Sequence, residues 1–228
     1  DVFKKLLGDG NQFGIKIYYE IQDKPNGLAQ AFIIGEEFLN GDPCTLILGD
    51  NIFYGDALSS QIKQACINEG ATLFAYGVRD PERYGVLSFD DNNKVLDIEE
   101  KPIVPKSSYA VTGIYFYDNT VVKKAKSLRP SSRGEYEITD LNMIYLKENK
   151  LNIVKLGRGS AWLDTGTFES LNDACNYVRT IENRQNMKIG CPEEVAWRKG
   201  WIDSPQLKIL AETLSKSEYG NYIMNLIN

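Results

Sequence analysis

Two aspartates follow short apolar segments and are the residues best suited to chemistry in this chain. Asp50 stands in LILGDN, two residues after Leu48, and Asp164 stands in AWLDTG. A carboxylate that follows a buried strand costs free energy unless a partner compensates its charge. Two carboxylates with phosphate oxygens and water suit Mg²⁺, because this ion prefers hard oxygen ligands. Each aspartate can equally be the N-cap of a following helix, and both interpretations stay open.

Three further segments carry groups that suit a phosphate ligand. EEKP at 99–102 places a lysine, which meets phosphate as a point charge, after a predicted strand. PSSRGEYEITD at 130–140 places Arg133 before a predicted helix, where a cation opposes the helix dipole. QDKPNG at 22–27 forms a turn, and the helix after it has free amides for an acceptor group. Each segment also fits solvated surface or an ordinary connection, so only their combination is informative.

The composition narrows the possible chemistry. The chain has 228 residues, a net charge of −5 and no histidine. The lack of histidine excludes Ser-His-Asp catalysis, Cys-His catalysis and histidine-ligated zinc. The acidic balance argues against nucleic-acid binding, and no apolar run approaches the roughly 20 residues of a membrane helix. The four cysteines form no CxxC pair, which favours a reduced, cytoplasmic protein.

Strand-like and helix-like segments alternate along the chain, which predicts an α/β fold. The hydrophobic periods predict strands at 15–21, 44–48, 71–78, 84–89, 94–98, 109–117 and 151–156. They predict helices at 27–40, 58–68, 119–128, 135–148, 167–183, 192–199, 204–213 and 217–227. The βαβ rhythm favours a mixed, mostly parallel sheet covered by helices. We therefore expect a core at 1–165 and a helical region at 166–228 that packs on it.

Eight segments, taken in order, resemble a known family. They are QDKPNGLAQA, LILGDNIFYG, DPERYGV, EEKP, YAVTGIYFYD, SSRGEYEITD, GRGSAWLDTG and CPEEVAWR, and the resemblance covers essentially the whole chain. The set resembles the short bacterial glucose-1-phosphate thymidylyltransferases, which are sugar nucleotidyltransferases. The resemblance implies a three-layer, Rossmann-like nucleotidyltransferase fold. It also implies transfer from dTTP to glucose 1-phosphate, giving dTDP-glucose and pyrophosphate with Mg²⁺.

The resemblance implies a role for each residue that matches a family motif. It implies that Asp50 and Asp164 bind Mg²⁺ and that Gln22 and Gly27 contact the thymine. It places Tyr84, Gly85, Glu100 and Val111 in the glucose pocket, Lys101 and Arg133 on the sugar phosphate, and Trp162 near the site. The sugar phosphate is already ionised at neutral pH and needs no general base. We therefore expect a direct in-line displacement without a covalent enzyme intermediate.

One part of the family pattern has no counterpart in these residues. The family begins with a strand and a glycine-rich loop of the form GGxGTRL, followed by a PK motif, and these bind the triphosphate. This chain instead starts at Asp1 in a segment that resembles the helix after the family's third strand. We therefore expect the 228 residues alone to have little transferase activity. An assay of pyrophosphate release tests this expectation, and turnover near that of an intact family member would contradict it.

Two alternatives to this enzyme remain at the level of sequence. One is a non-catalytic, sugar-nucleotide-binding or regulatory homologue. The other is a nucleotidyltransferase for a different nucleotide or sugar phosphate, which a panel of both substrates would reveal through a strong preference for UTP. The resemblance also implies a homotetramer with a separate regulatory site.

Overall fold

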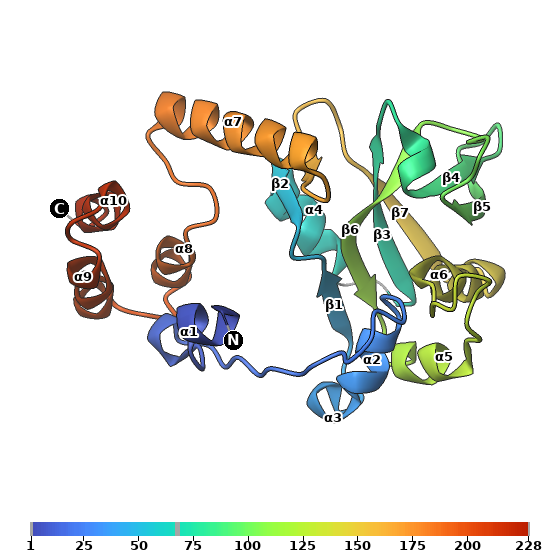
Figure 1. Ribbon diagram of the computed structural model, residues 1–228, viewed down its shortest axis with the longest axis horizontal. Helices are drawn as coiled ribbons and strands as arrows, with labels where there is room; N and C mark the ends of the chain where they lie inside the picture. The colour runs from blue at the N-terminus through green and yellow to red at the C-terminus, as the bar shows by residue number, and fades with distance from the viewer. Residues whose placement is uncertain (1, 67–68, 228) are drawn as a thin grey trace. The chain divides into compact units, whose positions relative to one another are not determined.

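The computed structural model describes residues 2–66 and 69–227, which divide into two compact units (Figure 1). One unit is Gln22–Leu171, and the other combines residues 1–21 with residues 172–228. This division differs from the expected core at 1–165 and helical region at 166–228. The difference arises because Leu7 and Phe13 pack in one hydrophobic cluster with the C-terminal helices.

The larger unit contains all the described strands and five complete helices. The strands are β1 (Cys44–Ile47), β2 (Asn51–Tyr54), β3 (Ala71–Gly77), β4 (Gly85–Phe89), β5 (Val95–Glu100), β6 (Tyr109–Tyr117), β7 (Leu151–Lys155) and β8 (Ala161–Asp164). The helices are α2 (Gln30–Ile34), α3 (Glu36–Leu39), α4 (Leu58–Ala65), α5 (Val121–Ser127) and α6 (Ile138–Lys147). A further helix, α7 (Phe168–Gln185), begins in this unit and ends in the other.

The main sheet has the strand order β5-β4-β6-β3-β7, and β1 also pairs with β6. β6 runs antiparallel to β1, β3 and β4, and β4 runs antiparallel to β5. Among the described strands of this sheet, only β3 and β7 run parallel. The predicted mixed α/β architecture is confirmed, but the prediction of a mostly parallel sheet is wrong. An apolar run such as β6 specifies a buried strand but not its direction, and β6 lies antiparallel at the centre.

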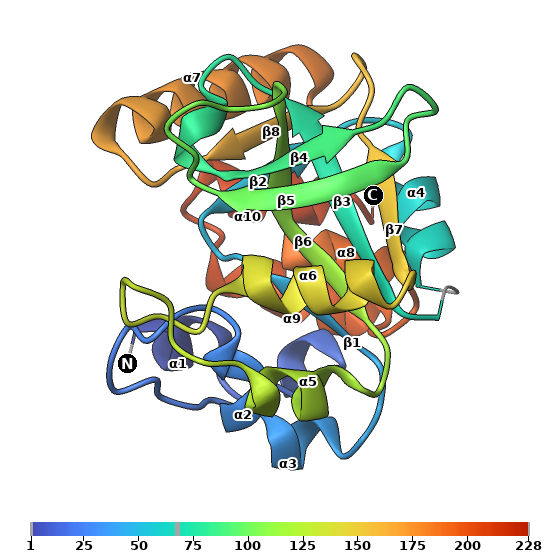
Figure 2. The ribbon, with the colours of Figure 1, turned by 90° about the vertical axis from the view of Figure 1, so that its right-hand side faces the viewer.

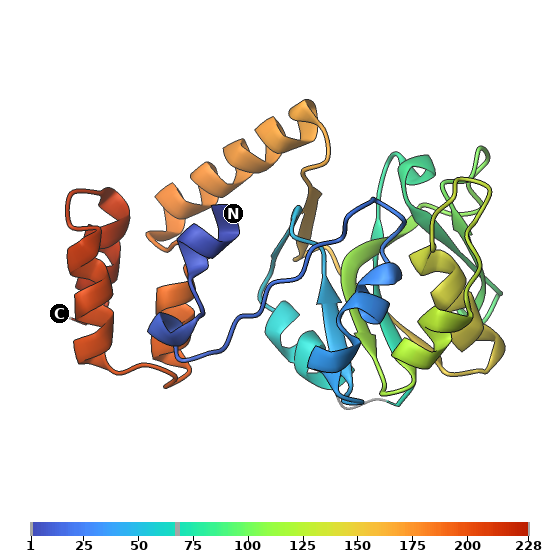
Figure 3. The ribbon, with the colours of Figure 1, turned by 60° about the horizontal axis from the view of Figure 1, so that its bottom comes forward.

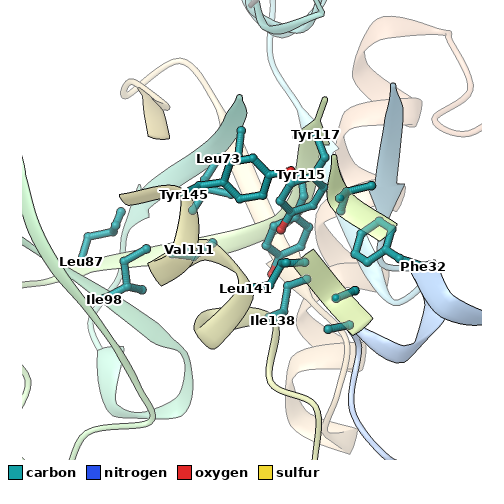
Figure 4. Packing of buried hydrophobic residues seen from close by; sticks show 14 of the residues in the cluster. Phe32, Leu73, Leu87, Ile98, Val111, Tyr115, Tyr117, Ile138, Leu141 and Tyr145 are labelled. Atoms are coloured by element: carbon teal, nitrogen blue, oxygen red, sulfur yellow. The ribbon is translucent and has the colours of Figure 1, made fainter. Parts of the chain in front are cut away.

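Helices cover both faces of the main sheet, which gives three layers. Successive side chains of a strand point to opposite faces, and Leu73 and Phe74 of β3 accordingly belong to different hydrophobic clusters. The cluster around Leu73 includes residues of α2, α5 and α6 (Figure 4), whereas that around Phe74 includes α4. β4 and β5 lie across the ends of β3 and β6, so the sheet curls (Figure 2).

Two predicted elements of the N-terminal region differ from the structure. Residues 15–21 form no strand, although IKIYYEI has the required alternation. Tyr18 and Ile21 are 66% and 77% exposed, and no described strand pairs with this segment. The predicted helix at 27–40 is interrupted at Gly35 and forms α2 and α3. The predicted helix at 58–68 corresponds to α4, and its last two residues lie outside the described residues.

The smaller unit is helical, as the sequence predicts for its C-terminal part. It contains α1 (Val2–Leu7), α8 (Pro192–Arg198), α9 (Ser204–Thr213) and α10 (Glu218–Asn225), and α9 lies beside α10 (Figure 3). Asp203 and Ser217 cap α9 and α10 by accepting hydrogen bonds from backbone amides. Within residues 2–66 and 69–227, no helix has the length and apolar character needed to cross a membrane.

Candidate active site

A two-stranded ribbon brings the two predicted aspartates together. β2 pairs antiparallel with β8, and Asn51 stands directly opposite Asp164. The carbonyl oxygen of Asp50 accepts hydrogen bonds from the amide and hydroxyl of Thr165, at 2.9 and 2.8 Å. Asp50 and Asp164 consequently line the same pocket. The ribbon therefore joins two carboxylates that are more than a hundred residues apart in the sequence.

Neither carboxylate caps a helix in the described structure. The residue that precedes α4 is Ala57, which makes no side-chain cap, and the Asp50 carboxylate accepts a hydrogen bond from Asn51 Nδ2 instead. The Asp164 carboxylate accepts from side chains of the DPERYGV segment, whereas the first turn of α7 is closed by the Thr167 hydroxyl. The helix-cap interpretation is therefore wrong for both aspartates.

The pocket opens where the edge of β6 changes partner. β4 pairs with β6 at Ala110 and β1 pairs with it from Ile114 onward, so residues 111–113 lie between two strands on this edge. Asn51 Oδ1 fills part of this opening by accepting hydrogen bonds from Gly113 N, at 3.1 Å, and from Trp162 Nε1, at 2.6 Å. The remaining space is about 170 Å³. This volume is smaller than a site for a drug-sized ligand and suits a small polar one.

Most of the predicted site residues line this pocket. They are Asp50, Tyr84, Gly85, Glu100, Lys101, Val111, Trp162 and Asp164. Ten residues that were not predicted line it as well: Leu28, Leu48, Asn51, Arg83, Thr112, Gly113, Tyr115, Ile138, Thr139 and Asn142. Arg83 and Asn51 adjoin predicted site residues within DPERYGV and LILGDN, and that adjacency is the only signal for them in the sequence. The aliphatic and α6 residues carry no comparable signal, because they also fit an ordinary core.

Gly85 allows the Glu100 carboxylate to enter the pocket. Gly85 and Glu100 are paired residues of β4 and β5. A Cβ atom on Gly85 would lie 3.2 Å from Thr139 Oγ1 and 3.4 Å from Glu100 Oε2, so a larger residue would push on both groups. The Thr139 hydroxyl donates to Glu100 Oε2 at 2.6 Å. One acceptor is thereby fixed at a wall of the pocket.

Lys101 lies at a backbone turn immediately after β5. Its φ angle is +46°, a left-handed conformation that residues other than glycine adopt at a cost. The Lys101 amide donates to the carbonyl of Tyr84 at 2.9 Å, which holds the turn. Unfavourable backbone conformations of this kind concentrate at functional sites. The turn directs the exposed Lys101 to the pocket, where the sequence predicted a phosphate-binding cation.

Arg133 lies beside the pocket rather than in its lining. Its guanidinium makes a two-point contact with Glu137, from Nε to Oε1 at 3.1 Å and from Nη2 to Oε2 at 2.8 Å. The same Nη2 is 3.7 Å from Glu100 Oε1, which places Arg133 next to a lining residue. Burial alone would raise the pKa of Glu137, but hydrogen bonds from Arg133 and Ser131 hold that pKa below its usual value. Glu137 thus stays ionised and orients Arg133.

The lowered pKa of Glu137 predicts a specific loss of stability in acid. A carboxyl group whose folded-state pKa is depressed stabilises the fold above its unfolded pKa. That contribution is lost as the pH falls through the folded-state pKa. As the pH falls below the ordinary carboxyl pKa of about 4.3, Glu137→Gln should therefore lose less unfolding free energy than the unmodified chain. Urea unfolding at each pH measures this, and parallel pH profiles for the two proteins would contradict it.

Gln22 and Gly27 lie together on the loop before α2, outside the pocket lining. Gln22 Nε2 donates to the Gly27 carbonyl at 3.1 Å and to Gln30 Oε1 at 2.7 Å. Gly27 has a φ of +100°, and a Cβ atom there would lie 2.4 Å from the carbonyl oxygen of Tyr136. Only glycine fits this approach, which fixes the loop against the segment that leads into α6. The predicted thymine contacts thus lie next to one another, and Leu28 links their loop to the pocket.

The carboxylates of the pocket suit a divalent cation that is shared with a phosphate ligand. Asp164 ends β8 and Asp50 directly precedes β2, so these two hard oxygen donors lie at adjoining ends of paired strands. The described residues contain no group of three or more Asp, Glu, Cys or His side chains that could hold a metal by themselves. Mg²⁺ commonly binds through one or two carboxylates, with waters and substrate phosphates completing its shell. The residues present fit that mode of binding.

Comparisons with known proteins give the family. A family model described as "Nucleotidyl transferase" matches residues 1–180. The glucose-1-phosphate thymidylyltransferase of Neisseria meningitidis is 55% identical over 99% of this chain and 78% of its own length. That of Mycolicibacterium smegmatis is 53% identical, with the same coverage of both chains.

Solved structures agree with the sequence comparisons. A putative glucose-1-phosphate thymidylyltransferase from Bacillus anthracis, solved with a sucrose, is 41% identical, with a TM-score of 0.72. The match covers 84% of this chain and 74% of that one. A UDP-glucose pyrophosphorylase matches with a TM-score of 0.61 at 21% identity, a likeness of fold alone. Together, the fold, the pocket and these relatives show that the chain belongs to the glucose-1-phosphate thymidylyltransferases, a family of sugar nucleotidyltransferases.

Proposed function

We propose that nucleotidyl transfer from dTTP to glucose 1-phosphate takes place at the pocket beside β6. The observation that carries this proposal is the meeting of Asp50 and Asp164 on the β2–β8 ribbon, in a pocket that Lys101 also lines. Two anionic substrates repel each other, so the barrier to their reaction is mainly electrostatic and orientational. A site that combines acidic oxygens for a cation with a separate basic group can reduce the repulsion between the substrates and orient them for reaction.

Asp50 and Asp164 would hold Mg²⁺. An ion held by these two carboxylates would neutralise negative charge on the phosphate that is attacked. The protein contributes the placement of these carboxylates. Thr165 fixes the backbone of Asp50, and Tyr84 donates to the Asp164 carboxylate at 3.4 Å. Burial, together with the Asp164 carboxylate, raises the pKa of Tyr84 to about 12. The Tyr84 hydroxyl therefore remains a donor at neutral pH.

Lys101 and Arg133 would hold the phosphate of glucose 1-phosphate. Lys101 reaches the pocket from its left-handed turn, and Arg133 is held beside Glu100 by Glu137. Glu100 and the backbone near Gly85 and Val111 would bind the hydroxyl groups of the sugar, because carboxylates and backbone groups supply directional hydrogen bonds. This arrangement orients the sugar phosphate, which is already ionised and needs no general base.

Gln22 and Gly27 would recognise the thymine. Gln22 carries an amide that both donates and accepts, as the edge of a pyrimidine base requires. In the structure, Gln22 Nε2 donates to Oε1 of Gln30, the first residue of α2, so the two carboxamides lie side by side. We also propose a cytoplasmic location, which is supported by four cysteines that are free thiols. A homo-oligomer, expected as a tetramer, is supported by exposed apolar side chains along α1, at Val2, Phe3 and Leu6.

The stereochemistry at phosphorus tests the direct displacement. With one isomer of dTTP carrying sulfur on its α-phosphate, a single in-line attack by the sugar phosphate should invert the configuration. Two successive displacements through a covalent enzyme intermediate would restore the original configuration. Phosphorus NMR of the product separates the two outcomes. Retention of configuration would overturn the single-displacement mechanism. It would not test whether the reaction takes place in this pocket, which the substitutions of Asp50, Lys101 and Arg133 test separately.

A further inference from the structure

Arg83 pairs with Asp164, one of the two aspartates assigned to the metal. We propose that Arg83 is an internal counter-ion that occupies Asp164 and opposes binding of a divalent cation until the nucleotide arrives. The inference rests on the proposed role of Asp164 as a metal ligand, and it assigns to Arg83 a regulation of that site. Arg83 is thus a positioning residue that acts through Asp164.

The contacts of Arg83 hold its guanidinium between two carboxylates. The short 3₁₀ turn Pro81–Arg83, labelled η2, directs the side chain. Nη2 is 3.0 Å from Asp164 Oδ2, and Nη1 is 2.9 Å from Asp80 Oδ2. The guanidinium carbon lies 5.2 Å from the centre of the Tyr84 ring. Charge-assisted contacts on two sides and an aromatic neighbour fix the position of this cation.

The two donors of this cluster meet the same oxygen of Asp164. Arg83 Nη2 and the Tyr84 hydroxyl both donate to Oδ2, at 3.0 and 3.4 Å. A Cβ atom placed on Gly166 would lie 3.3 Å from Oδ1, so the glycine leaves space beside it. A cation on Oδ1 would therefore share one carboxylate with a guanidinium.

The net charge of the pocket decides whether Arg83 favours or opposes binding of a divalent cation. The charged residues that line it are three carboxylates, Asp50, Glu100 and Asp164, and two cations, Arg83 and Lys101. The Asp164 side chain is only 16% exposed, so solvent screens its neighbourhood incompletely. A divalent cation alone would reverse the sign of the lining charge. A cation accompanied by a triphosphate would not, because the phosphate oxygens bring several negative charges with it.

This balance makes metal binding conditional on nucleotide. In the free protein, Arg83 keeps Asp164 paired and limits repulsion between the two carboxylates. With the nucleotide present, the phosphate charge offsets both Arg83 and the metal. An alternative role for Arg83 is that of a brace, which would orient Asp164 and strengthen metal binding in every state. The two roles predict opposite effects when the positive charge is removed.

Mn²⁺ binding measured by electron paramagnetic resonance distinguishes these roles without reliance on catalysis. In the protein without nucleotide, Arg83→Gln should bind Mn²⁺ about fivefold more tightly than the unmodified chain. Arg83→Lys retains the positive charge and should bind like the unmodified chain. Arg79→Gln is the matched control, because it removes an exposed arginine four residues away. Addition of a non-hydrolysable dTTP analogue should narrow the difference between Arg83→Gln and the unmodified chain.

Unchanged or weaker Mn²⁺ binding by Arg83→Gln, without nucleotide, would overturn the counter-ion role. Arg83→Ala provides the same comparison if the glutamine variant does not fold, as judged by circular dichroism. Asp164→Asn tests the assumption beneath the inference. If Asp164→Asn binds Mn²⁺ as the unmodified chain does, with and without the nucleotide analogue, the proposed metal site itself is wrong. If Asp164→Asn loses binding while Arg83→Gln gains none, only the role of Arg83 fails.

Discussion

Asp50→Asn should reduce turnover about a thousandfold in an active enzyme that contains this chain. The substitution removes one of two anionic ligands from the proposed Mg²⁺ site and keeps the shape of the side chain. The backbone carbonyl of Asp50, not its side chain, holds Thr165, so the β2–β8 ribbon should stay intact. The Asn51 amide can also donate to the new carboxamide oxygen as it does to Asp50 Oδ1. The loss should therefore be one of metal binding rather than of folding.

Two measurements separate these causes. Pyrophosphate release should fall for Asp50→Asn, and raising the Mg²⁺ concentration should restore part of the rate, because a weakened site can be filled by mass action. Thermal unfolding should stay close to that of the parent protein. Asp56→Asn removes an exposed aspartate six residues away and should keep full activity. Full activity of Asp50→Asn, over a range of Mg²⁺ concentrations, would show that Asp50 is not a metal ligand.

The sequence predicted best those elements whose pattern is local. β6 was expected at 109–117 and α9 at 204–213, and both occur with those bounds. β6 is a long apolar run, and α9 has a helical period that starts at a capping aspartate, so short-range signals suffice for each. The direction of β6 was not predictable in this way, because an apolar run reads the same in both directions. The mostly parallel sheet was predicted from the alternation of strands and helices, and the structure shows mostly antiparallel pairs instead.

At the candidate site, too, single residues could be predicted from their neighbours in the sequence, but their contacts with distant residues could not. Asp50 and Asp164 each follow an apolar segment, which made them visible one at a time. Their meeting depends on the pairing of β2 with β8, and four-residue strands give little signal of a distant partner. Arg83 is the clearest omission, because an arginine in a polar turn is usually solvated surface. Its contact with Asp164 exists only after the turn at 81–83 is placed beside β8.

Lys101→Met and Arg133→Met should each lower kcat/KM for glucose 1-phosphate about a hundredfold. Both cations are assigned to the same phosphate, so each variant leaves that anion with half its charge partners and a less fixed orientation. The affinity for dTTP, measured by calorimetry, should change little. Arg133→Lys should recover only part of the loss, because a lysine cannot keep the two-point contact with Glu137 that fixes the guanidinium.

The double variant gives the sharper test of a shared ligand. Residues that act on one group are not additive, so Lys101→Met with Arg133→Met should cost less than the product of the two single losses. Lys106→Met is the matched control: this exposed lysine, five residues beyond Lys101, pairs with Asp97 and Glu99 and should be replaceable without effect. Fully multiplicative losses would mean that the two cations act on different groups. If either variant instead weakened dTTP binding as much as it lowered kcat/KM, that cation would contact the nucleotide. A cation that contacts only the sugar phosphate should leave the affinity for dTTP, measured without glucose 1-phosphate, unchanged.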